Sequence, residues 1–574
     1  MTVNKVSIKV GGEAGWGIMT IGSLCAQALQ HAGLHIFMQS DYPSLIKGGH
    51  NTVLIRAEEQ ELHSCIKQID ILIALDAQTI TKHHMELSEQ GAIIYDTGRV
   101  ELDVSALVRK DVILHGLPLK KMALEVGNAI YANTIAFGAV TGLLKIDLKH
   151  LEAVIRKQFA KKTEKVIQDN MVAIRKGYDA VQNKTFKHTI QEVAHETNTL
   201  IDGNEAISYG ALKAGCKFYS AYPMTPASSI LHVLAAQQNN YNIVVKHTED
   251  ELAAILMAIG ANYSGVRAMT GTSGGGFSLM TEALGMAGLT EVPLVVVEVQ
   301  RPGPSTGLPT YTGQGDLRFM LHASQDEFPR VVIAPGDVEE CFYETVNAFN
   351  VAEGLQVPVI ILSDKQLATS AKTTPSFKTA IPITRGKLLT NEEAARQTDY
   401  QRHEFTADGI SPRALPGQQN CLYVCSSYEH DERGKTSEDP LMHVHMTDKR
   451  MKKLQSIPLA LIKPRVMGEG EYTIVTWGST KGPAREALGF LERKGIKARL
   501  IHYTYITPFP VEETKKLITN PEKTIVVEGN SLAQFRDWLF QQTGIFIPNT
   551  YLKYDGRPFY PEDIQERVQA LVKQ

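Results

Sequence analysis

The sequence predicts a multidomain α/β protein. Short apolar runs alternate with longer segments in which apolar residues recur at helical spacing, and glycine-rich turns stand where several of these runs end. This alternation is typical of parallel sheets covered by helices. The chain has 574 residues, enough for about four structural units of ordinary size.

The first unit is predicted over residues 1–185. Its elements are a strand at Lys5–Val10, a glycine-rich turn at Gly11–Gly17, a helix at Ile18–Ala32 and buried strands at Ile71–Leu75 and Ala92–Asp96. A helical stretch from Leu148 to Gln182 ends it. The polar residues 186–198 carry no strong strand pattern, and we interpret them as a linker.

A second unit with a parallel sheet is predicted over residues 199–370. Its strands are expected at Cys216–Ser220, Ile243–Val245, Val266–Thr270, Leu294–Val299, Val331–Ile333 and Val359–Leu362. Residues 371–464, rich in Thr, Pro and charged side chains, are interpreted as a long irregular connector. A third α/β unit is predicted over 465–574, with strands at Tyr472–Trp477, Ala498–Ile501 and Thr524–Glu528 and a helix at Ala484–Lys494.

The charge balance and apolar runs exclude several classes of protein. The 59 basic and 62 acidic residues give a net charge of −3, which argues against nucleic-acid binding. The apolar runs are far shorter than the roughly 20 residues that span a bilayer. The first ten residues alternate like a strand and lack the apolar core of a signal peptide. We therefore expect a cytoplasmic protein without a membrane segment.

The six cysteines do not form a recognisable cluster motif. None lies in a CxxC pair, although zinc and iron–sulfur sites usually contain a tight pair of ligands. A zinc site built from Cys421, Cys425, His443 and His445 is one alternative. Free thiols in a reducing compartment, with no resident metal, are the favoured interpretation.

Residues Gly11–Gly17 form a glycine-rich segment, GGEAGWG, before the first helix. The N–H groups of such a turn suit phosphate, but the spacing differs from the dinucleotide fingerprint. A tight strand-to-helix turn and a nucleotide site, including NAD, are both kept as interpretations.

Two candidate residues follow strands of the second unit. Thr225 lies in the stiff segment YPMTP at 222–226, where its hydroxyl is suited to contact a ligand beyond the strand end. The alternative is that Thr225 or Ser228 caps the next helix. Glu251 lies in HTEDELAA, where Thr248 and Glu251 match a capping box. The competing interpretation is a carboxylate directed into a cleft.

Two further motifs follow the next strands. The glycine run Gly271–Gly276 suits close approach of backbone to a ligand, or else a flexible turn. Arg301 begins RPGPSTGLPT at the end of its strand, where a guanidinium is placed to bind a carboxylate. The alternative is an ordinary surface arginine.

Together these motifs resemble the α subunit of 2-oxoacid:ferredoxin oxidoreductases. The resemblance rests on YPMTP, HTEDELAA, GTSGGGFSLM and QRPGPSTGLPT, which occur in that order. GGEAGWG and YPSLIKGGHN (42–51) resemble the family's γ subunit, so the chain resembles a fused γ–α form. WGSTKGPAREAL and TPFP (507–510) resemble a transketolase-type C-terminal domain. The resemblance covers essentially the whole chain and implies a thiamine diphosphate pyrimidine-type domain over 199–370.

The resemblance implies oxidative decarboxylation of a 2-oxoacid to an acyl-CoA, with ferredoxin as electron acceptor, or the reverse carboxylation. Glu251 is implied to contact N1′ of the aminopyrimidine of thiamine diphosphate, with Tyr222 and Pro223 beside the cofactor. Thr225 and Arg301 are implied to bind the 2-oxoacid head.

Part of the family's machinery is absent from the sequence. The chain has no GDG motif for diphosphate and Mg²⁺ and no run of cysteines for a 4Fe–4S cluster. A β subunit is therefore expected to supply these groups, in a dimer of αβ heterodimers. The chain alone is expected to be inactive.

Lys47 is the candidate for recognising the substrate's distal end. The resemblance implies that this lysine binds the second carboxylate of 2-oxoglutarate, which is the favoured substrate and would give succinyl-CoA. Tyr311 stands where some broad-specificity members carry a basic residue, and Gly274-Gly275-Gly276 replaces the family's glycine–proline–glycine. The alternatives are pyruvate, an aryl or branched-chain 2-oxoacid or a broad range of 2-oxoacids; an NAD-binding enzyme; and a non-catalytic scaffold subunit.

Overall fold

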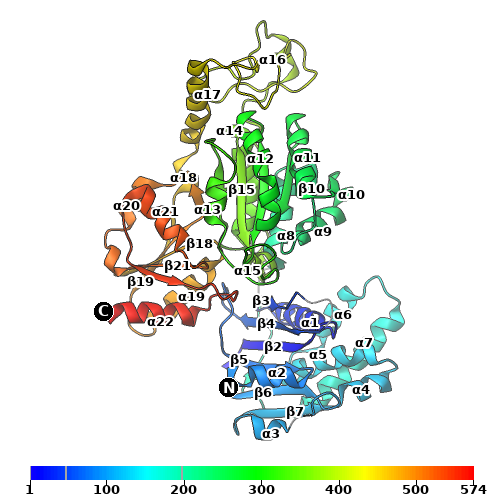
Figure 1. The fold of residues 1–574 in the computed structure, drawn as a ribbon. Coiled ribbons are helices and arrows are strands. Elements are labelled where there is room, and N and C mark those ends of the chain that lie inside the picture. Colours follow the sequence, from blue (N-terminus) through cyan, green and yellow to red (C-terminus); the bar gives the residue numbers. More distant parts are fainter. Residues whose placement is uncertain (1, 45–47, 102, 195–197, 574) are drawn as a thin grey trace. The chain divides into compact units, whose positions relative to one another are not determined.

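The computed structural model describes residues 2–44, 48–101, 103–194 and 198–573. The chain divides into two compact units. The first comprises Met1–Asp202, Thr369–Ser376 and Tyr560–Glu562, and the second comprises Gly203–Ala368, Phe377–Phe559 and Asp563–Gln574. Both are mixtures of helices and sheets, which confirms the predicted α/β class (Figure 1). The predicted division into four ranges stays a prediction.

The first unit is built on an eight-stranded mixed sheet in the order β7-β6-β5-β2-β4-β3-β16-β9. Strands β5, β6 and β7 run parallel to β2, whereas β4, β3, β16 and β9 are joined by antiparallel pairings. The strands are β2 (Lys5–Glu13), β3 (His35–Asp41), β4 (His50–Glu58), β5 (Ile69–Ala74), β6 (Leu87–Asp96), β7 (Ile113–Leu117), β9 (Asn198–Asp202) and β16 (Ala371–Pro375).

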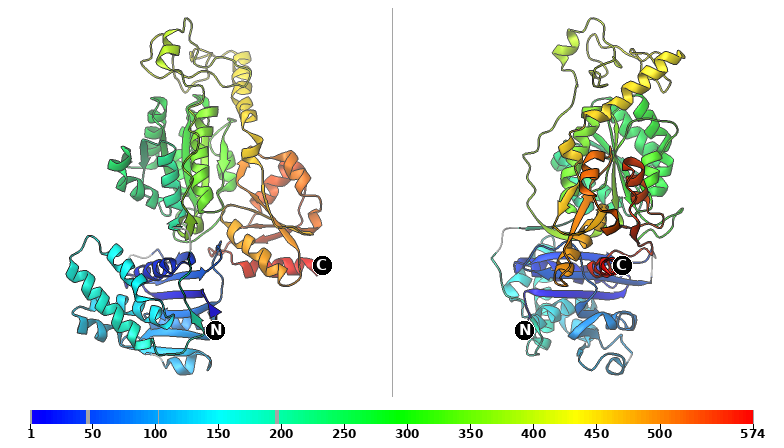
Figure 2. Two further views of the ribbon diagram at one scale, coloured as in Figure 1. Left: turned by 180° about the vertical axis from the view of Figure 1, so that it is seen from behind. Right: turned by 90° about the vertical axis from the view of Figure 1, so that its left-hand side faces the viewer.

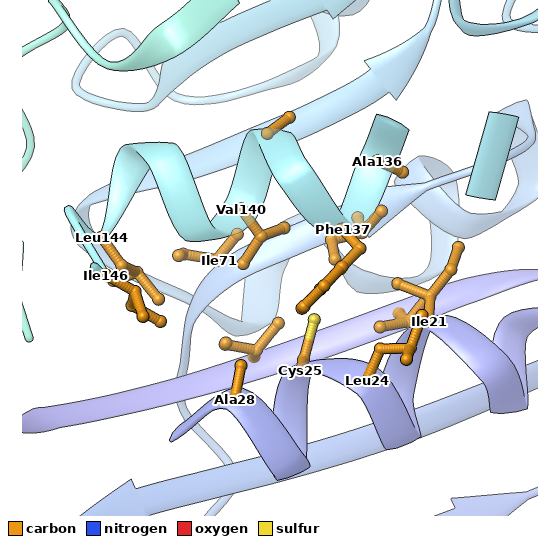
Figure 3. Close-up of a cluster of buried hydrophobic side chains, with 14 of the residues drawn as sticks. Ile21, Leu24, Cys25, Ala28, Ile71, Ala136, Phe137, Val140, Leu144 and Ile146 are labelled. Carbon is orange, nitrogen blue, oxygen red and sulfur yellow. The ribbon is translucent and has the colours of Figure 1, made fainter. Parts of the chain in front are cut away.

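Seven α-helices accompany this sheet in the described residues: α1 (Ile18–His31), α2 (Ala77–His83), α3 (Val104–Leu107), α4 (Leu119–Val126), α5 (Ala132–Leu143), α6 (Leu148–Gln158) and α7 (Glu164–Val181). Figure 3 shows part of the core, where Leu24 and Cys25 of α1 face Phe137 and Val140 of α5. Burial of these apolar side chains is the main stabilising contribution here.

Several predicted elements of the first unit differ from the structure. Strand β2 continues to Glu13, so the glycine-rich turn is shorter than expected. The stretch 148–182 is two helices, because residues 159–163 interrupt it. In the predicted linker, β8 (His188–Thr189) pairs with β1 (Thr2–Val3). The first residues of the connector form β16, whose partners are β3 and β9.

The second unit contains a seven-stranded sheet in the order β11-β10-β12-β13-β15-β14-β20. All neighbours are parallel except β20 beside β14. The strands are β10 (Phe218–Ala221), β11 (Val244–His247), β12 (Ala268–Thr272), β13 (Leu294–Gln300), β14 (Val331–Ile333), β15 (Pro358–Asp364) and β20 (Tyr505–Thr507).

Helices cover both faces of this sheet. Helices α8 (Gly203–Lys213), α9 (Ser228–Ala236) and α14 (Val338–Leu355) pack together on one face, and α11 (Glu251–Tyr263) and α12 (Gly274–Leu289) pack together on the other. The short helices α10 (Gln238–Tyr241), α13 (Leu317–His322) and α15 (Lys365–Thr369) complete this part.

The predicted connector is partly ordered. It contains α16 (Asn391–Ala395), α17 (Pro440–Lys452) and α18 (Leu459–Ile462), and a small core that includes Tyr400 and Cys421. Figures 1 and 2 show α16 and α17 beyond one end of the seven-stranded sheet, opposite α15, which directly follows β15. The part of the connector that carries α16 and α17 therefore lies at the amino ends of the parallel strands.

The C-terminal part of the second unit has a five-stranded sheet in the order β17-β19-β18-β21-β22. Its strands are β17 (Arg465–Met467), β18 (Tyr472–Trp477), β19 (Ala498–Tyr503), β21 (Thr524–Glu528) and β22 (Asn549–Leu552), and its helices are α19 (Lys481–Glu492), α20 (Val511–Leu517), α21 (Gln534–Thr543) and α22 (Pro561–Val572). Among the described residues, no helix combines the length and apolarity that crossing a membrane requires.

Candidate active site

Four sequence motifs meet at the carboxyl end of the seven-stranded sheet. They follow β10, β11, β12 and β13, which lie next to one another in the order β11-β10-β12-β13. Because these strands are parallel, the segments that follow them emerge at one edge, where open α/β sheets bind ligands.

Arg301 and Thr225 are in direct contact. The Arg301 guanidinium donates from Nη1 to the backbone carbonyl of Thr225 at 2.6 Å, which joins the segments after β13 and β10. Asn204 holds the neighbouring residue, since its Nδ2 donates to the carbonyl of Pro226 at 2.9 Å. The structure therefore fixes the YPMTP segment against the arginine.

The segment around Thr225 does not cap the next helix with a side chain. Helix α9 begins at Ser228, its N-cap is Ala227, and no side-chain cap bond is formed. The alternative role of Thr225 or Ser228 as a helix cap is therefore wrong. Tyr222 is 41% exposed and lies beside the ring of His247, and Pro223 is half-buried.

The predicted capping box of Thr248 and Glu251 is also wrong. Asp250 is the N-cap of α11, and its carboxylate accepts from the N–H of Ala253 at 2.8 Å. Thr248 instead donates its hydroxyl to the Asp250 carbonyl at 2.8 Å. Since Asp250 takes the capping role, the carboxylate of Glu251 serves another purpose.

The Glu251 carboxylate is buried between β12 and the start of α12. Glu251 is 3% exposed. Among the described residues, its carboxylate accepts one hydrogen bond, from the Thr272 hydroxyl at 3.5 Å. A Cβ atom at Gly276 would lie 2.3 Å from Glu251 Oε1 and 2.1 Å from Thr272 Oγ1. The carboxylate thus occupies space that only glycine leaves, and it keeps unused acceptor capacity.

The glycine run is not a separate loop, because Gly271 and Thr272 end β12 and Gly274–Gly276 form the first turn of α12. Ser273 is the N-cap, but no side chain caps the helix, and the Ser273 hydroxyl is buried without a partner in the described structure. The first N–H groups of a helix have no partner within the helix and carry the positive end of its dipole. This end of α12 therefore favours negative charge.

Arg301 lines a cleft of about 480 Å³. The other lining residues come from the YPMTP segment, the start of α12, the loop after β13 and the start of α13: Met224, Gly274, Gly275, Ser278, Gly303, Pro304, Ser305, Thr306, Asp316 and Phe319. Burial lowers the pKa of Arg301, and the nearby Asp316 and Glu298 partly oppose that shift. Sequence analysis placed Arg301 correctly at a strand end in a shaped loop.

Sequence reasoning missed two acidic residues, one that lines this cleft and one buried in the strand before Arg301. Asp316 lines it, and burial raises the pKa of its carboxyl to about 6, against the influence of Arg301. Glu298 lies in β13, and burial raises its pKa well above the usual range, with Asp316 and Asp364 adding to the shift. The sequence feature that could have identified Glu298 is a single glutamate within the otherwise apolar strand LVVVEVQ.

The first unit contains a second group of predicted residues. Lys47 lies outside the described residues. His50 from the same motif is bonded through its Nε2 to Nε2 of His83 at 2.8 Å, and His83 Nδ1 is 2.7 Å from Glu86 Oε1. Gly17, with φ at 77°, is the N-cap of α1. This geometry supports a tight strand-to-helix turn at the end of GGEAGWG.

The four proposed zinc ligands are not assembled in the described residues. Cys421 is buried against the carbonyl of Ala394, Cys425 is exposed, and His443 contacts Glu429 at 2.6 Å. The zinc site is therefore wrong, because the connector folds these side chains into separate contacts.

A different buried group, Glu291, His403 and His430, has ligand-type atoms within 4.8 Å of one another. Lys449 already contacts both carboxylate oxygens of Glu291, at 2.7 and 2.8 Å. A cation would have to displace this ammonium group, so the arrangement serves as an ion-pair cluster.

Three family descriptions match different parts of the chain. Residues 209–449 match "Pyruvate flavodoxin/ferredoxin oxidoreductase, thiamine diP-bdg", residues 7–180 match "Pyruvate ferredoxin/flavodoxin oxidoreductase", and residues 470–564 match "Pyruvate:ferredoxin oxidoreductase core domain II".

Relatives match over nearly the full chain. A 2-oxoacid:ferredoxin oxidoreductase subunit alpha from Sulfolobus sp is 33% identical over 99% of this chain and 97% of its own length. The 2-oxoglutarate oxidoreductase subunit KorA from Mycobacterium tuberculosis is 29% identical over 99% of this chain and 92% of its own. A solved 2-oxoglutarate:ferredoxin oxidoreductase from Magnetococcus marinus, with 2-oxoglutarate, coenzyme A and succinyl-CoA bound, is 33% identical with a TM-score of 0.92, covering 99% of this chain and 100% of that one.

Proposed function

Because the chain belongs to the 2-oxoacid:ferredoxin oxidoreductase family as an α-type subunit, we propose that it works with a β-type subunit on 2-oxoglutarate. The reaction is CoA-dependent oxidative decarboxylation to succinyl-CoA and CO₂ with ferredoxin as electron acceptor, or its reverse. The observation that carries this proposal is the contact of Arg301 with Thr225 in a cleft at the strand ends.

Arg301 is the proposed ligand of the carboxylate beside the oxo group. A guanidinium carries five N–H donors, and the Thr225 carbonyl engages Nη1, so other donors remain for a substrate. A carboxylate matches the planar fork of an arginine in a bidentate pair. The bond to Thr225 fixes the arginine, and the Thr225 hydroxyl is the proposed second contact for the 2-oxoacid head.

Glu251 is the proposed ligand of the aminopyrimidine of thiamine diphosphate. The residues fit this group, because a buried carboxylate with one long hydrogen bond retains lone pairs for a ring N–H. When bound, thiamine diphosphate supplies the nucleophilic carbon that attacks the oxo group. Glu251 holds a proton at N1′, and Thr272 and Gly276 keep the carboxylate in place. Tyr222 and Pro223 are proposed to lie beside the same group.

The exposed face of α11 and α12 is the proposed docking surface for the β subunit. Leu252, Leu256 and Met257 of α11 and Leu279 of α12 are between 40% and 48% exposed, close in sequence to Glu251 and the glycine run. A helix that is apolar on all sides requires cover on both faces. The β subunit is proposed to supply diphosphate binding, Mg²⁺ and a 4Fe–4S cluster, in a dimer of αβ heterodimers.

The preference for 2-oxoglutarate rests on two relatives. The solved structure at 33% identity is described with 2-oxoglutarate bound, and the mycobacterial KorA subunit is named for that substrate. The Sulfolobus relative at 33% identity is named only for 2-oxoacids, which favours a broad 2-oxoacid enzyme as the second candidate. Lys47 remains the proposed ligand of the distal carboxylate.

The test is to co-purify this chain with its β-type subunit and to measure CoA-dependent reduction of a viologen or ferredoxin with a panel of 2-oxoacids. We expect activity with 2-oxoglutarate from the complex and none from the chain alone. Replacing Lys47 by Ala is expected to impair 2-oxoglutarate turnover more than pyruvate turnover, whereas the exposed Lys120→Ala leaves both unchanged. Activity from the single chain contradicts the proposal, and a preference for pyruvate contradicts its substrate.

A further inference from the structure

Asp316 stands in the same cleft as Arg301 without forming an ion pair with it. Both residues line the cavity of about 480 Å³, and each influences the charge of the other. In the described structure no Asp316 oxygen lies within ion-pair distance of the guanidinium, whose Nη1 is directed to the Thr225 carbonyl instead. The cleft therefore holds a cation and an anion that are close but not joined.

The backbone of Asp316 is tied to the strand that carries Arg301. Its N–H donates to Oε1 of Gln300 at 3.1 Å, and Gln300 is the residue before Arg301. Gln300 in turn donates from Nε2 to the carbonyl of Ser363 at 3.1 Å. On the other side, Gln534 donates to the carbonyl of Gly315 at 2.7 Å. Asp316 thus has a fixed position relative to the arginine.

The side chain of Asp316 lies against the start of α12. A Cβ atom at Gly274 would be 2.5 Å from Asp316 Oδ2, so the carboxyl uses room that a glycine leaves free. Its charged neighbours are Arg301, from the loop after β13, and Glu298, within β13. Both carboxyl oxygens of Glu298 are buried without a hydrogen-bond partner in the described structure. Asp364 on β15 faces Glu298 in turn.

These surroundings leave Asp316 poised between its two protonation states. Burial raises the pKa of its carboxyl to about 6 while Arg301 acts in the opposite direction. Burial also raises the pKa of Glu298 well above the usual value of 4.5, with Asp316 and Asp364 adding to the shift. Asp316 is therefore an acidic group of this cleft whose charge responds to a new anion beside Arg301.

We propose that Asp316 is a specificity-determining residue whose carboxylate balances Arg301 in the empty cleft and takes up a proton when a 2-oxoacid carboxylate binds there. The inference rests on the proposed function. An anion on Arg301 places like charge beside Asp316 and withdraws the stabilising influence of the cation, and both effects favour the protonated acid. Binding of the substrate and binding of a proton are then coupled, so the affinity for anionic substrates falls as Asp316 ionises.

The test measures KM and kcat of the complex with its β-type subunit across the titration of Asp316. If binding raises the pKa of Asp316 from about 6 by about one unit, KM for the 2-oxoacid rises about sixfold from about pH 5.5 to about pH 7.5, towards a limit of about tenfold. Asp316→Asn is expected to hold KM near the low-pH value throughout, with the pH profile of kcat retained. Asp316→Glu keeps an acid at this place and is expected to retain the rise.

Asp537→Asn is the matched control, because this aspartate pairs with Arg318 of α13 on the surface, outside the cleft. Its KM profile is expected to follow the wild type.

A flat wild-type KM, or a rise that persists in Asp316→Asn, overturns the proposal. If Asp316→Asn fails to fold, the wild-type and Asp316→Glu profiles decide, since a flat profile in both overturns it. If the wild-type complex is inactive toward every 2-oxoacid, the proposed function is wrong as well. If the complex is active but its KM does not change with pH, only the proposed role of Asp316 is wrong.

Discussion

Two buried glutamates lie before and within strand β13, and the fold surrounds them in opposite ways. Glu291, before the strand, contacts Lys449 at 2.7 Å, Lys453 and Nδ1 of His403 at 3.0 Å. Glu298, near the carboxyl end, has both oxygens buried without a hydrogen-bond partner in the described structure. The carboxylate of Glu291 is thus fully paired with positive groups, whereas the carboxyl of Glu298 has no hydrogen-bond partner in the described structure.

The pKa values of the two acids are consequently shifted in opposite directions. Burial alone would raise the pKa of Glu291, but Lys453, Lys449 and His403 hold it well below its usual range. Burial and the neighbouring Asp316 and Asp364 raise the pKa of Glu298 well above it. At the amino end of the sheet, ion pairs of Glu291 hold the connector, whereas near the carboxyl end the carboxyl of Glu298 has no such partner in the described structure.

The largest expected effect comes from removing the charge of Glu291, the acid that is paired with buried lysines. Glu291→Gln leaves Lys449 and Lys453 buried without a negative partner, and we expect a loss of about 3–5 kcal/mol in the free energy of unfolding. Since the pKa of Glu291 is lowered in the folded protein, its contribution is complete above the usual value of 4.5 and is lost as the pH falls below it. Chemical denaturation of both proteins at several pH values measures this.

The exposed Glu512→Gln is the control for that substitution. Glu512 is 75% exposed in its surface pair with Lys515, and such pairs contribute little. Equal stability of the Glu291 and Glu512 variants would show that the ion-pair cluster does not anchor the connector.

The second largest effect is expected at the exposed apolar face of α11, next to the carboxyl end of the seven-stranded sheet. Leu256→Glu places a charge on the face of α11 that we assign to the β subunit, and we expect association at least about tenfold weaker. Leu124→Glu, at a site in α4 that is 57% exposed, is the control and should associate normally. Sedimentation of the mixed subunits measures both. Unchanged association of Leu256→Glu would remove the assigned interface.

The smallest effect is expected at the isolated acid. Glu298→Gln replaces a neutral carboxyl by a neutral amide, so at about pH 5 we expect a change within about 1 kcal/mol in the free energy of unfolding. Because the pKa of Glu298 is raised in the folded protein, the wild type loses stability as the pH rises above 4.5. The variant should therefore gain stability relative to the wild type as the pH rises above 4.5. A difference that does not change with pH would contradict a protonated Glu298.

Buried apolar runs allowed much of the fold to be predicted. Val331–Ile333, Tyr472–Trp477 and Thr524–Glu528 are strands with the predicted bounds, because each is a short run that a covered sheet requires. Strand β16 was missed, since Ala371–Pro375 is polar and pairs with β3, more than 300 residues earlier in the chain. Local pattern carries no information about such distant pairing.

The candidate site was predictable where a residue stands at a strand end. Thr225, Glu251 and Arg301 lie at the expected edge, but the cap of α11 was misassigned because Asp250 competes with Thr248 for the same N–H groups. Asp316 follows a long loop, so its return to the cleft depends on tertiary contacts such as that with Gln300.

The central claim is that the carboxyl end of this sheet performs the chemistry through Glu251. The most direct measurement is kcat of the complex carrying Glu251→Gln, with Glu249→Gln, at an exposed neighbouring position, as the control. We predict that Glu251→Gln lowers kcat about 100- to 1,000-fold while its thermal unfolding midpoint and the activity of the control stay near wild type. A Glu251→Gln complex that retains wild-type turnover would contradict the account.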